Sequence, residues 1–476
     1  MSPKTIFASV ALVIALGSLE KSIVTTPLPI IGEELGAGQA LTWVVTAYLL
    51  AATAVLPVYG KLSDIFGRVK MLNISVALFL LGSVACAIAQ DLPTLVAARV
   101  LQGIGGGGLI ALAFTVIADC IPAREVGKYQ GYISAVYAAS SIAGPLLGGY
   151  FAEHLSWRWV FWINLPLGAV ALWMINTNLK HLSKGRDSRF DWAGAGLLMT
   201  ITTLLLLLMS PDIAISQISL IIATVVAMIM FMVVEKRVSD PILPARLFNL
   251  PGYLISVLLI MCSQLLMFAV LVYLPLQMQW QHGMTASASG LIMMVFMMSI
   301  TSGAYLGGKR IAKTGYYKSL VVLGFAMSVA AVFLLYQGLL MTVALAFAGL
   351  GLGLTLPSLN VVVQNVLPPQ DRGIGLSMFG YGREFGGAIG VAFCAALFHI
   401  KVPVLVGEGS TDGLAQFDSI ALGQGFTMTY GGLVVVALVS LVVAMVCLKA
   451  QPLSNDVAKP KRSYKPERSS KPKNLD

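Results

Sequence analysis

The sequence predicts an all-α membrane protein. Of its 476 residues, 57% are hydrophobic and only 11% are charged, whereas a soluble domain carries about 25% charged residues. The mean hydropathy is +0.85. Long apolar runs recur from one end of the chain to the other, and a helix that crosses a bilayer needs about 20 such residues. Together these observations exclude a water-soluble globule.

The apolar runs predict fourteen transmembrane helices. Their expected ranges, in chain order, are 5–28, 41–61, 71–90, 93–118, 128–152, 157–178, 192–210, 213–234, 253–278, 286–307, 319–336, 340–366, 374–399 and 426–448. The first run lacks a basic start and a small-residue cleavage site, so we expect a retained helix rather than a signal peptide. Most of the 31 Lys and Arg residues fall on one side if both termini are cytoplasmic, as the positive-inside rule requires.

An internal repeat divides the chain. The segment Gly60–Lys70, GKLSDIFGRVK, has a weaker copy at Gly308–Lys318, GKRIAKTGYYK. Two pseudo-symmetric six-helix bundles repeated in parallel are then expected, with two helices inserted between them. The expected parts are an N-terminal bundle over 1–180, the inserted pair with cytoplasmic linkers over 181–249, a C-terminal bundle over 250–450 and a disordered basic tail over 451–476.

Charged residues stand inside segments that otherwise read as apolar helix. Glu20 and Arg99 fall at nearly the same predicted depth, which indicates an interaction either directly or through water. Glu384 lies near the middle of its helix, and its neighbour Arg383 points about 100° away, so Arg383 cannot simply neutralise it. Three roles stay open for Glu384: a proton carrier, an anion for a cationic substrate, or a structural partner of Arg383.

The first basic loop contains residues that the orientation of the protein in the membrane does not by itself require. In the segment Gly60–Lys70 the glycines allow a tight turn and the cations hold the loop at the inner headgroups. We expect Asp64 to sit against the amino end of a helix in the other half, because a helix N-terminus attracts negative charge.

Five segments carry a family resemblance. Leu19–Pro29 resembles a first-helix motif in which Glu20 stands where the family usually has Asp, and Gly60–Lys70 resembles the motif between the second and third helices. Arg99–Gly107 is similar to the fourth-helix motif, Gly144–Gly149, GPLLGG, to a motif associated with exporters, and Trp157–Pro166 to a further typical stretch. The chain therefore resembles the 14-helix drug:proton antiporter family of the major facilitator superfamily.

The resemblance implies a proton-coupled antiporter that exports amphipathic, cationic drugs or toxic compounds by alternating access, as in multidrug efflux and antibiotic resistance. An exporter of an amino acid, polyamine or siderophore is the alternative, whereas Gly144–Gly149 disfavours a nutrient importer. The implied proton-coupling residues are Glu20, Arg99 and Glu384. The implied gating residues are Gly60, Asp64, Gly67, Arg68, Arg124, Gly144, Pro145, Gly148 and Gly149.

A substrate cavity is expected near the bilayer midplane, between the halves. The candidate lining residues are Trp43, Tyr48, Tyr137, Tyr273, Gln277, Asn360, Gln364 and Arg383, whereas Trp157, Trp159 and Trp280 are expected to be interfacial anchors. The partners are then protons, small drug-like molecules and lipid, with no nucleic acid, and a monomer in the cell membrane suffices.

Other classes have little support in the sequence. It has no nucleotide-binding glycine loop, its four His residues are scattered, and its five Cys residues lack metal-type spacing. We therefore expect no enzyme activity, no metal and no cofactor, with the proton gradient as the energy source. A channel would conduct without saturable exchange, which a flux assay distinguishes.

Overall fold

The computed structural model describes the following residues: 3–35, 43–121, 123–179, 190–208, 216–238, 241–284, 286–401 and 419–449. All regular structure within these ranges is helical. The expected basic tail over 451–476 lies outside these residues, as does the segment 402–418 between the last two long helices.

The N-terminal bundle holds the first six long helical segments. They are α1 (Pro3–Ile23), α3 (Trp43–Phe66), α4 (Arg68–Ala87), α5 (Leu92–Cys120), α6 (Ala123–His154) and the pair α7 (Trp159–Trp162) and α8 (Asn164–Asn178), while a short α2 (Leu28–Leu35) follows α1. The predicted first helix therefore ends at Ile23, five residues earlier than expected, ahead of Pro27.

The C-terminal bundle holds the last six. They are α12 (Tyr253–Trp280), α13 (Ala286–Thr314), α14 (Lys318–Tyr336), α15 (Met341–Val366), α16 (Arg372–Lys401) and α17 (Ser419–Val446). The short helix α11 (Ala245–Phe248) precedes α12, and the short 3₁₀ helix η2 (Pro369–Asp371) directly precedes α16. Eleven helices among the described residues are long and apolar enough to cross a membrane. The helix α9 has only 17 residues, and α6 and α16 carry more charged residues.

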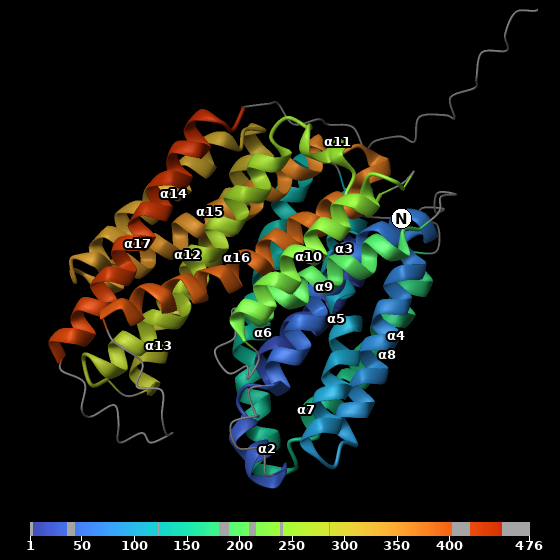
Figure 1. The fold of residues 1–476 in the computed structure, drawn as a ribbon, viewed down its shortest axis with the longest axis horizontal. Coiled ribbons are helices and arrows are strands. Elements are labelled where there is room, and N and C mark those ends of the chain that lie inside the picture. The colour runs from blue at the N-terminus through green and yellow to red at the C-terminus, as the bar shows by residue number, and fades with distance from the viewer. Residues whose placement is uncertain are drawn as a thin grey trace, which may run out of the picture.

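The two halves converge at one end of the molecule and diverge at the other (Figure 1). The contacts between them run from α3 to α16 and from α6 to α13. At the end where the N-terminus lies, the two halves are in contact. At the opposite end, α2 of the N-terminal half lies far from the lower end of α13 in the C-terminal half. We call these the closed end and the open end.

The inserted pair lies beside the junction of the halves. The pair consists of α9 (Trp192–Leu208) and α10 (Gln217–Glu235), which pack against each other, and α9 also packs on α3. Thr202 on α9 donates a hydrogen bond to the Tyr381 hydroxyl on α16 at 3.2 Å. Lys61 on α3 donates to the carbonyl of Pro241, which follows α10, at 3.0 Å. The pair therefore contacts both halves from outside the bundles.

The segment Gly60–Lys70 corrects one expectation. Gly60 and Asp64 belong to the last turns of α3, and only Gly67, with φ of 93°, interrupts the helix before α4 begins. Its repeat counterpart Gly315 also has a positive φ, of 73°, between α13 and α14. Because L-residues are strained there, glycine is required at this one position of the turn. Gly60 serves instead as a contact point for α16.

The glycine run of α5 permits close helix packing. Gly103 and Gly107 lie against the backbone of α3, and Gly105 lies against the backbone of Phe79 on α4. A Cβ atom at Gly105 would overlap that backbone. Small residues at such contacts allow membrane helices to approach closely, where packing supplies most of the association energy.

Gly105→Ala is therefore expected to destabilise the N-terminal bundle. Overpacking of a tight contact costs about 1–3 kcal/mol, and the purified variant in detergent should unfold at a temperature several degrees lower. Gly290→Ala on α13 is the matched control, because nothing lies within 4 Å of the added methyl group. Equal thermal unfolding of both variants and the parent protein would contradict the packing role.

Candidate functional site

A cavity lies between the two halves, and part of its space is continuous with the outside. Residues of α1, α3 and α5 line it from the N-terminal half, and residues of α15 and α16 line it from the C-terminal half. The walls are largely apolar and aromatic, as is usual for small-molecule sites. The apolar lining includes Leu49, Leu56, Ile110, Phe114, Leu376 and Phe379.

Three charged side chains reach this cavity. Lys21 on α1 donates to both carboxylate oxygens of Glu384 on α16, each at 3.0 Å, and so joins the two halves. Arg383 contacts the same carboxylate at 3.4 Å. The side chains of Lys21, Glu384 and Arg383 are 32%, 21% and 18% exposed, so the group is only partly withdrawn from the cavity space.

A second charged pair is fully enclosed within the N-terminal half. The Arg99 guanidinium on α5 binds the Glu20 carboxylate on α1 directly, and the two side chains are 2% and 0% exposed. Asn164 on α8 donates to the other Glu20 oxygen at 2.7 Å. Glu20 and Arg99 thus lie at one height, as their positions in the sequence predict, and their side chains meet without an intervening group.

Arg99 has several further partners. Its guanidinium donates to the carbonyl of Val44 at 2.8 Å and to the Gln102 side-chain oxygen at 2.5 Å. The Gln102 amide donates to the Ser83 hydroxyl on α4 at 2.9 Å. The ring of Tyr48 covers the guanidinium at 4.4 Å from its centroid, a favourable cation–π distance. Five helices thus contribute to this Glu20 cluster.

Tyr48 separates the Glu20 cluster from the cavity. It is almost fully buried, yet part of it lines the cavity wall. Neither Glu20 nor Arg99 is among the lining residues. In this conformation Glu20 lies behind Tyr48, inside its own half.

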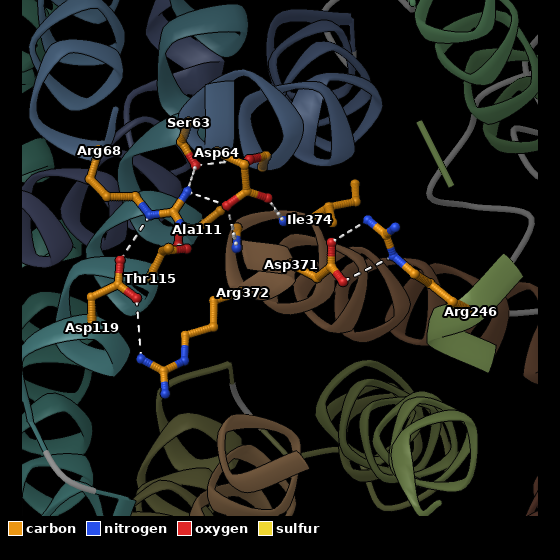
Figure 2. Close-up of polar contacts among 12 residues, drawn as sticks. Ser63, Asp64, Arg68, Ala111, Thr115, Asp119, Arg246, Asp371, Arg372 and Ile374 are labelled. Carbon is orange, nitrogen blue, oxygen red and sulfur yellow. Dashed lines mark hydrogen bonds and ion pairs between the residues drawn. The ribbon is translucent and has the colours of Figure 1, made fainter. Parts of the chain in front are cut away.

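The closed end holds a network of ion pairs that spans both halves (Figure 2). The Asp64 carboxylate accepts hydrogen bonds from the backbone amides of Gly373 and Ile374, at 3.0 and 2.9 Å. These amides belong to the first turn of α16, where the helix dipole favours a negative charge. Arg68 binds the same Asp64 carboxylate, and it is buried. The geometry is the one expected for Asp64.

Asp119 extends the network on the other side of Arg68. The Arg68 guanidinium donates to Asp119 at 2.9 Å, and Arg372 from the C-terminal half approaches the same carboxylate at 3.4 Å. Nearby, Arg246 forms two hydrogen bonds with Asp371, at 2.7 and 3.1 Å. Figure 2 shows the Asp64 and Asp119 carboxylates both directed toward groups at the start of α16. The closed end is therefore held by charge-assisted contacts.

Glycines of α6 face the end of α1. A side chain at Gly144 would overlap Ser22, and one at Gly148 would overlap the carbonyl of Ile23. Gly149 has only an ordinary contact distance to Thr26, and Pro145 lies exposed within α6. The predicted gating glycines thus bring α6 against α1 directly after Glu20 and Lys21. Arg124 falls in the first turn of α6, but its side chain lies outside the described residues.

The predicted lining residues fall into three groups. Tyr48, Asn360 and Arg383 line the cavity. Gln364 donates to Asn360 at 2.9 Å and Tyr137 lies near Arg383, so both stand directly behind the wall, while Trp43 begins α3 without being part of that lining.

Tyr273 and Gln277 are corrections, because both lie inside the C-terminal bundle. Tyr273 packs against Phe398, and Gln277 accepts a hydrogen bond from Tyr430 at 2.8 Å. A helix that is apolar on every side has no polar stripe to indicate which face meets the cavity.

Trp157 also differs from expectation, since it is buried rather than a surface anchor. Its indole donates to Glu34 at 2.7 Å, and Arg158 binds the same carboxylate at 2.5 Å. The hydrogen bond from Arg158 holds the pKa of Glu34 below its usual value, with a further contribution from the indole. Trp159 and Trp280 are exposed, as anchors would be.

Sequence reasoning missed several residues of the site. Gln102 and Asn164 lie within the motif segments Arg99–Gly107 and Trp157–Pro166, so polar side chains inside those apolar segments were the available signal. The partner of Lys21 was not identified. Among the described residues, no group of His, Cys, Asp or Glu side chains is placed to hold a metal ion.

Comparisons with known proteins agree with this architecture. The profile of the Major Facilitator Superfamily matches residues 10–391 and 257–473. The chain is 31% identical over 404 residues to the multidrug transporter protein MdtP of Bacillus subtilis, which covers 82% of this chain and 74% of that protein. It is 32% identical over 420 residues to the efflux pump LUC4 of a Fusarium species, with 83% and 74% covered.

A further relative, an uncharacterised transporter of Mycobacterium tuberculosis, is 32% identical over 427 residues, which are 87% of this chain. The match spans 62% of the length of that relative.

Solved structures support the same fold. The human organic anion transporter MFSD10 aligns with a TM-score of 0.69 at 16% identity, over 93% of this chain and all of that one. The proton:xylose symporter XylE aligns with a TM-score of 0.64 at 16% identity, over 92% and 94% of the two chains. At such identities the likeness concerns the fold alone. With a matching profile over most of its length and a two-bundle helical fold, this multi-pass membrane protein belongs to the Major Facilitator Superfamily.

Proposed function

We propose that this transporter exports amphipathic compounds in exchange for protons by alternating access. The observation that carries the proposal is the enclosed Glu20–Arg99 pair. Glu20 is next in the chain to Lys21, which lines the cavity between the halves, and the ring of Tyr48 lies between Arg99 and that cavity. Ionisable groups inside membrane helices are costly and mark ion or proton pathways. The names of relatives such as the multidrug transporter protein MdtP support export.

The contacts of the closed end support alternating access. Asp64 and Asp119 bind groups of the opposite half there, while the halves diverge at the open end. We propose that the closed end faces the cytoplasm, because Lys and Arg are concentrated in the loops on that side. The structure then corresponds to an outward-open state, and breaking the Asp64 and Asp119 contacts leads to the inward-open state.

Protonation of Glu20 is the proposed coupling step. A proton from outside binds a Glu20 carboxylate oxygen, which removes the charge that Arg99 neutralises. Arg99 keeps other partners, namely the Val44 carbonyl, the Gln102 oxygen and the Tyr48 ring. These partners lower the cost of leaving the guanidinium without its carboxylate. The proton is released on the other side once the cavity opens inward.

Tyr48 connects this step to the cavity. Its ring lies on Arg99 and also forms part of the cavity wall, so a movement of Arg99 changes the wall that a substrate contacts. The expectation of a cationic substrate gains no support from that wall, where Lys21 and Arg383 outnumber Glu384. The three roles first considered for Glu384 did not include an ion pair with Lys21.

Glu20→Gln should abolish proton-driven efflux, because glutamine retains the shape of the side chain but cannot carry a proton on and off. In proteoliposomes with an imposed pH gradient, uphill transport of a fluorescent amphipathic dye is expected to fall to background. Dye exchange without a gradient should continue, since the cavity is unchanged. Glu153→Gln, at an exposed position near the end of α6, is the control. Undiminished uphill transport by Glu20→Gln would refute the coupling role.

Asp64→Asn should shift the protein away from the closed-end conformation. The substitution weakens two charge-assisted hydrogen bonds to α16 and the ion pair with Arg68. Bonds to charged groups are worth about 1.5–3 kcal/mol each, so a population change of about tenfold or more is expected. Spin labels at the exposed positions Lys70 and Lys313, in a background without accessible cysteines, report the separation by electron–electron resonance.

The matched control for this experiment is Asp91→Asn. Asp91 also caps a helix, accepting from the Thr94 amide at 2.8 Å, but it does so within one half at the start of α5. Its substitution should leave the distance distribution unchanged. An unchanged distribution in Asp64→Asn as well would show that the Asp64 contact does not hold the halves together.

A further inference from the structure

The charges of the central cavity do not cancel. Of the residues that line it, Lys21, Arg383 and Glu384 are the charged ones. Lys21 holds both oxygens of Glu384 at 3.0 Å and forms a neutral pair with it. Arg383 reaches that pair with a single contact at 3.4 Å. One positive charge therefore remains over among the lining residues.

Among the described residues, Glu384 is the one carboxylate that contacts Arg383. Its guanidinium lies 5.7 Å from the centroid of the Phe114 ring and close to Tyr137. The other acidic side chain nearby in the fold, Glu20, is enclosed with Arg99 behind Tyr48. Because a guanidinium has five donors in a planar fork that suits carboxylates, Arg383 retains the capacity to bind one.

The rest of the wall suits an apolar body. Leu49, Leu56, Phe114 and Phe379 line the cavity on both sides of the junction. A ligand with an aromatic or aliphatic body would bury its apolar surface there and present its charged group to α16. Burial of a cationic group at the same place would set it beside Arg383 and Lys21, which costs energy.

We infer that the cavity selects amphipathic compounds that carry a carboxylate, with Arg383 as the principal anchor and Lys21 as a second cation. The inference rests on the proposed export function and specifies its substrate class. Glu384 then acts as a tethered competitor, because its carboxylate occupies the donors that a ligand carboxylate would use. The inference concerns binding and is independent of how proton movement is coupled.

A matched ligand series tests it directly. Naphthaleneacetate, naphthylmethylammonium and naphthylmethanol share one aromatic body and differ in charge. Equilibrium binding of each to the full chain in lipid nanodiscs should rank the carboxylate first, about tenfold or more tighter than the ammonium compound, as one charge-assisted contact would produce. Equal affinities, or preference for the ammonium compound, would overturn the inference.

Two substitutions separate recognition from damage to the fold. Glu384→Gln should raise the affinity for naphthaleneacetate several-fold, since it frees Lys21 and Arg383, and a gain in affinity is not produced by loss of structure. Arg383→Gln should remove the difference between the carboxylate and the neutral alcohol. Arg237→Gln removes a cation at an exposed position after α10 and should change neither. An unaltered or weakened affinity in Glu384→Gln would contradict the competitor role.

Transport measurements keep this result distinct from the proposed function. If a pH gradient drives uphill movement of the ammonium compound but not of the carboxylate, proton-driven export stands and the substrate class is wrong. If the carboxylate binds best but no gradient drives any of the three ligands, the substrate class stands and the coupling proposal fails.

Discussion

A charge inside an apolar bundle has to be neutralised where it stands, and this constraint governs the arrangement of the protein. Glu20 and Arg99 satisfy it within one half, through a contact supplemented by Asn164 and Gln102. Lys21 and Glu384 satisfy it across the two halves, as do Asp64 and the first amides of α16. Breaking a buried pair without replacement costs several kcal/mol, so the buried contacts of Asp64 with the opposite half favour the conformation in which they exist.

The two kinds of pairing have different consequences for movement. A contact within one half can persist while the halves rock as rigid bodies, whereas a contact between halves has to break and re-form. The close glycine contacts of α5 with α3 and α4 favour rigid-body motion, because those helices approach at backbone distance. The inserted pair contacts α3 of one half and α16 of the other from outside the bundles. A relative motion of the halves would therefore change its contacts.

The helical architecture followed from the sequence because a long apolar run has few other solutions in a bilayer. Contacts within motifs were also accessible, since the depth of Glu20 and Arg99 could be counted along two helices. The Gly60–Lys70 segment was misread as a loop because its glycines and charges resemble loop composition, although Gly67 alone breaks the helix. Helix propensity and packing against α16 outweigh that local signal.

Other parts of the site could not be read from the chain. Lys21 and Glu384 are 363 residues apart, and their meeting depends on how the halves are set against each other, which no local pattern encodes. Tyr273 and Gln277 were assigned to the wrong face because α12 is apolar almost all round. Likewise, Arg246 and Asp371 lie in two short connecting segments, α11 and η2. Their contact depends on how the helices meet at the closed end and could not be predicted from either segment.

Glu20 and Lys21 are neighbours on α1, yet one belongs to the interior of its own half and the other bonds to the opposite half. Successive helix positions differ in direction by about 100°. A rotation of α1 about its long axis would therefore displace Glu20 relative to Arg99 and Lys21 relative to Glu384 at the same time. The proposed protonation of Glu20 would thus be linked, through the one peptide unit between the two residues, to the contact that Lys21 makes with the opposite half.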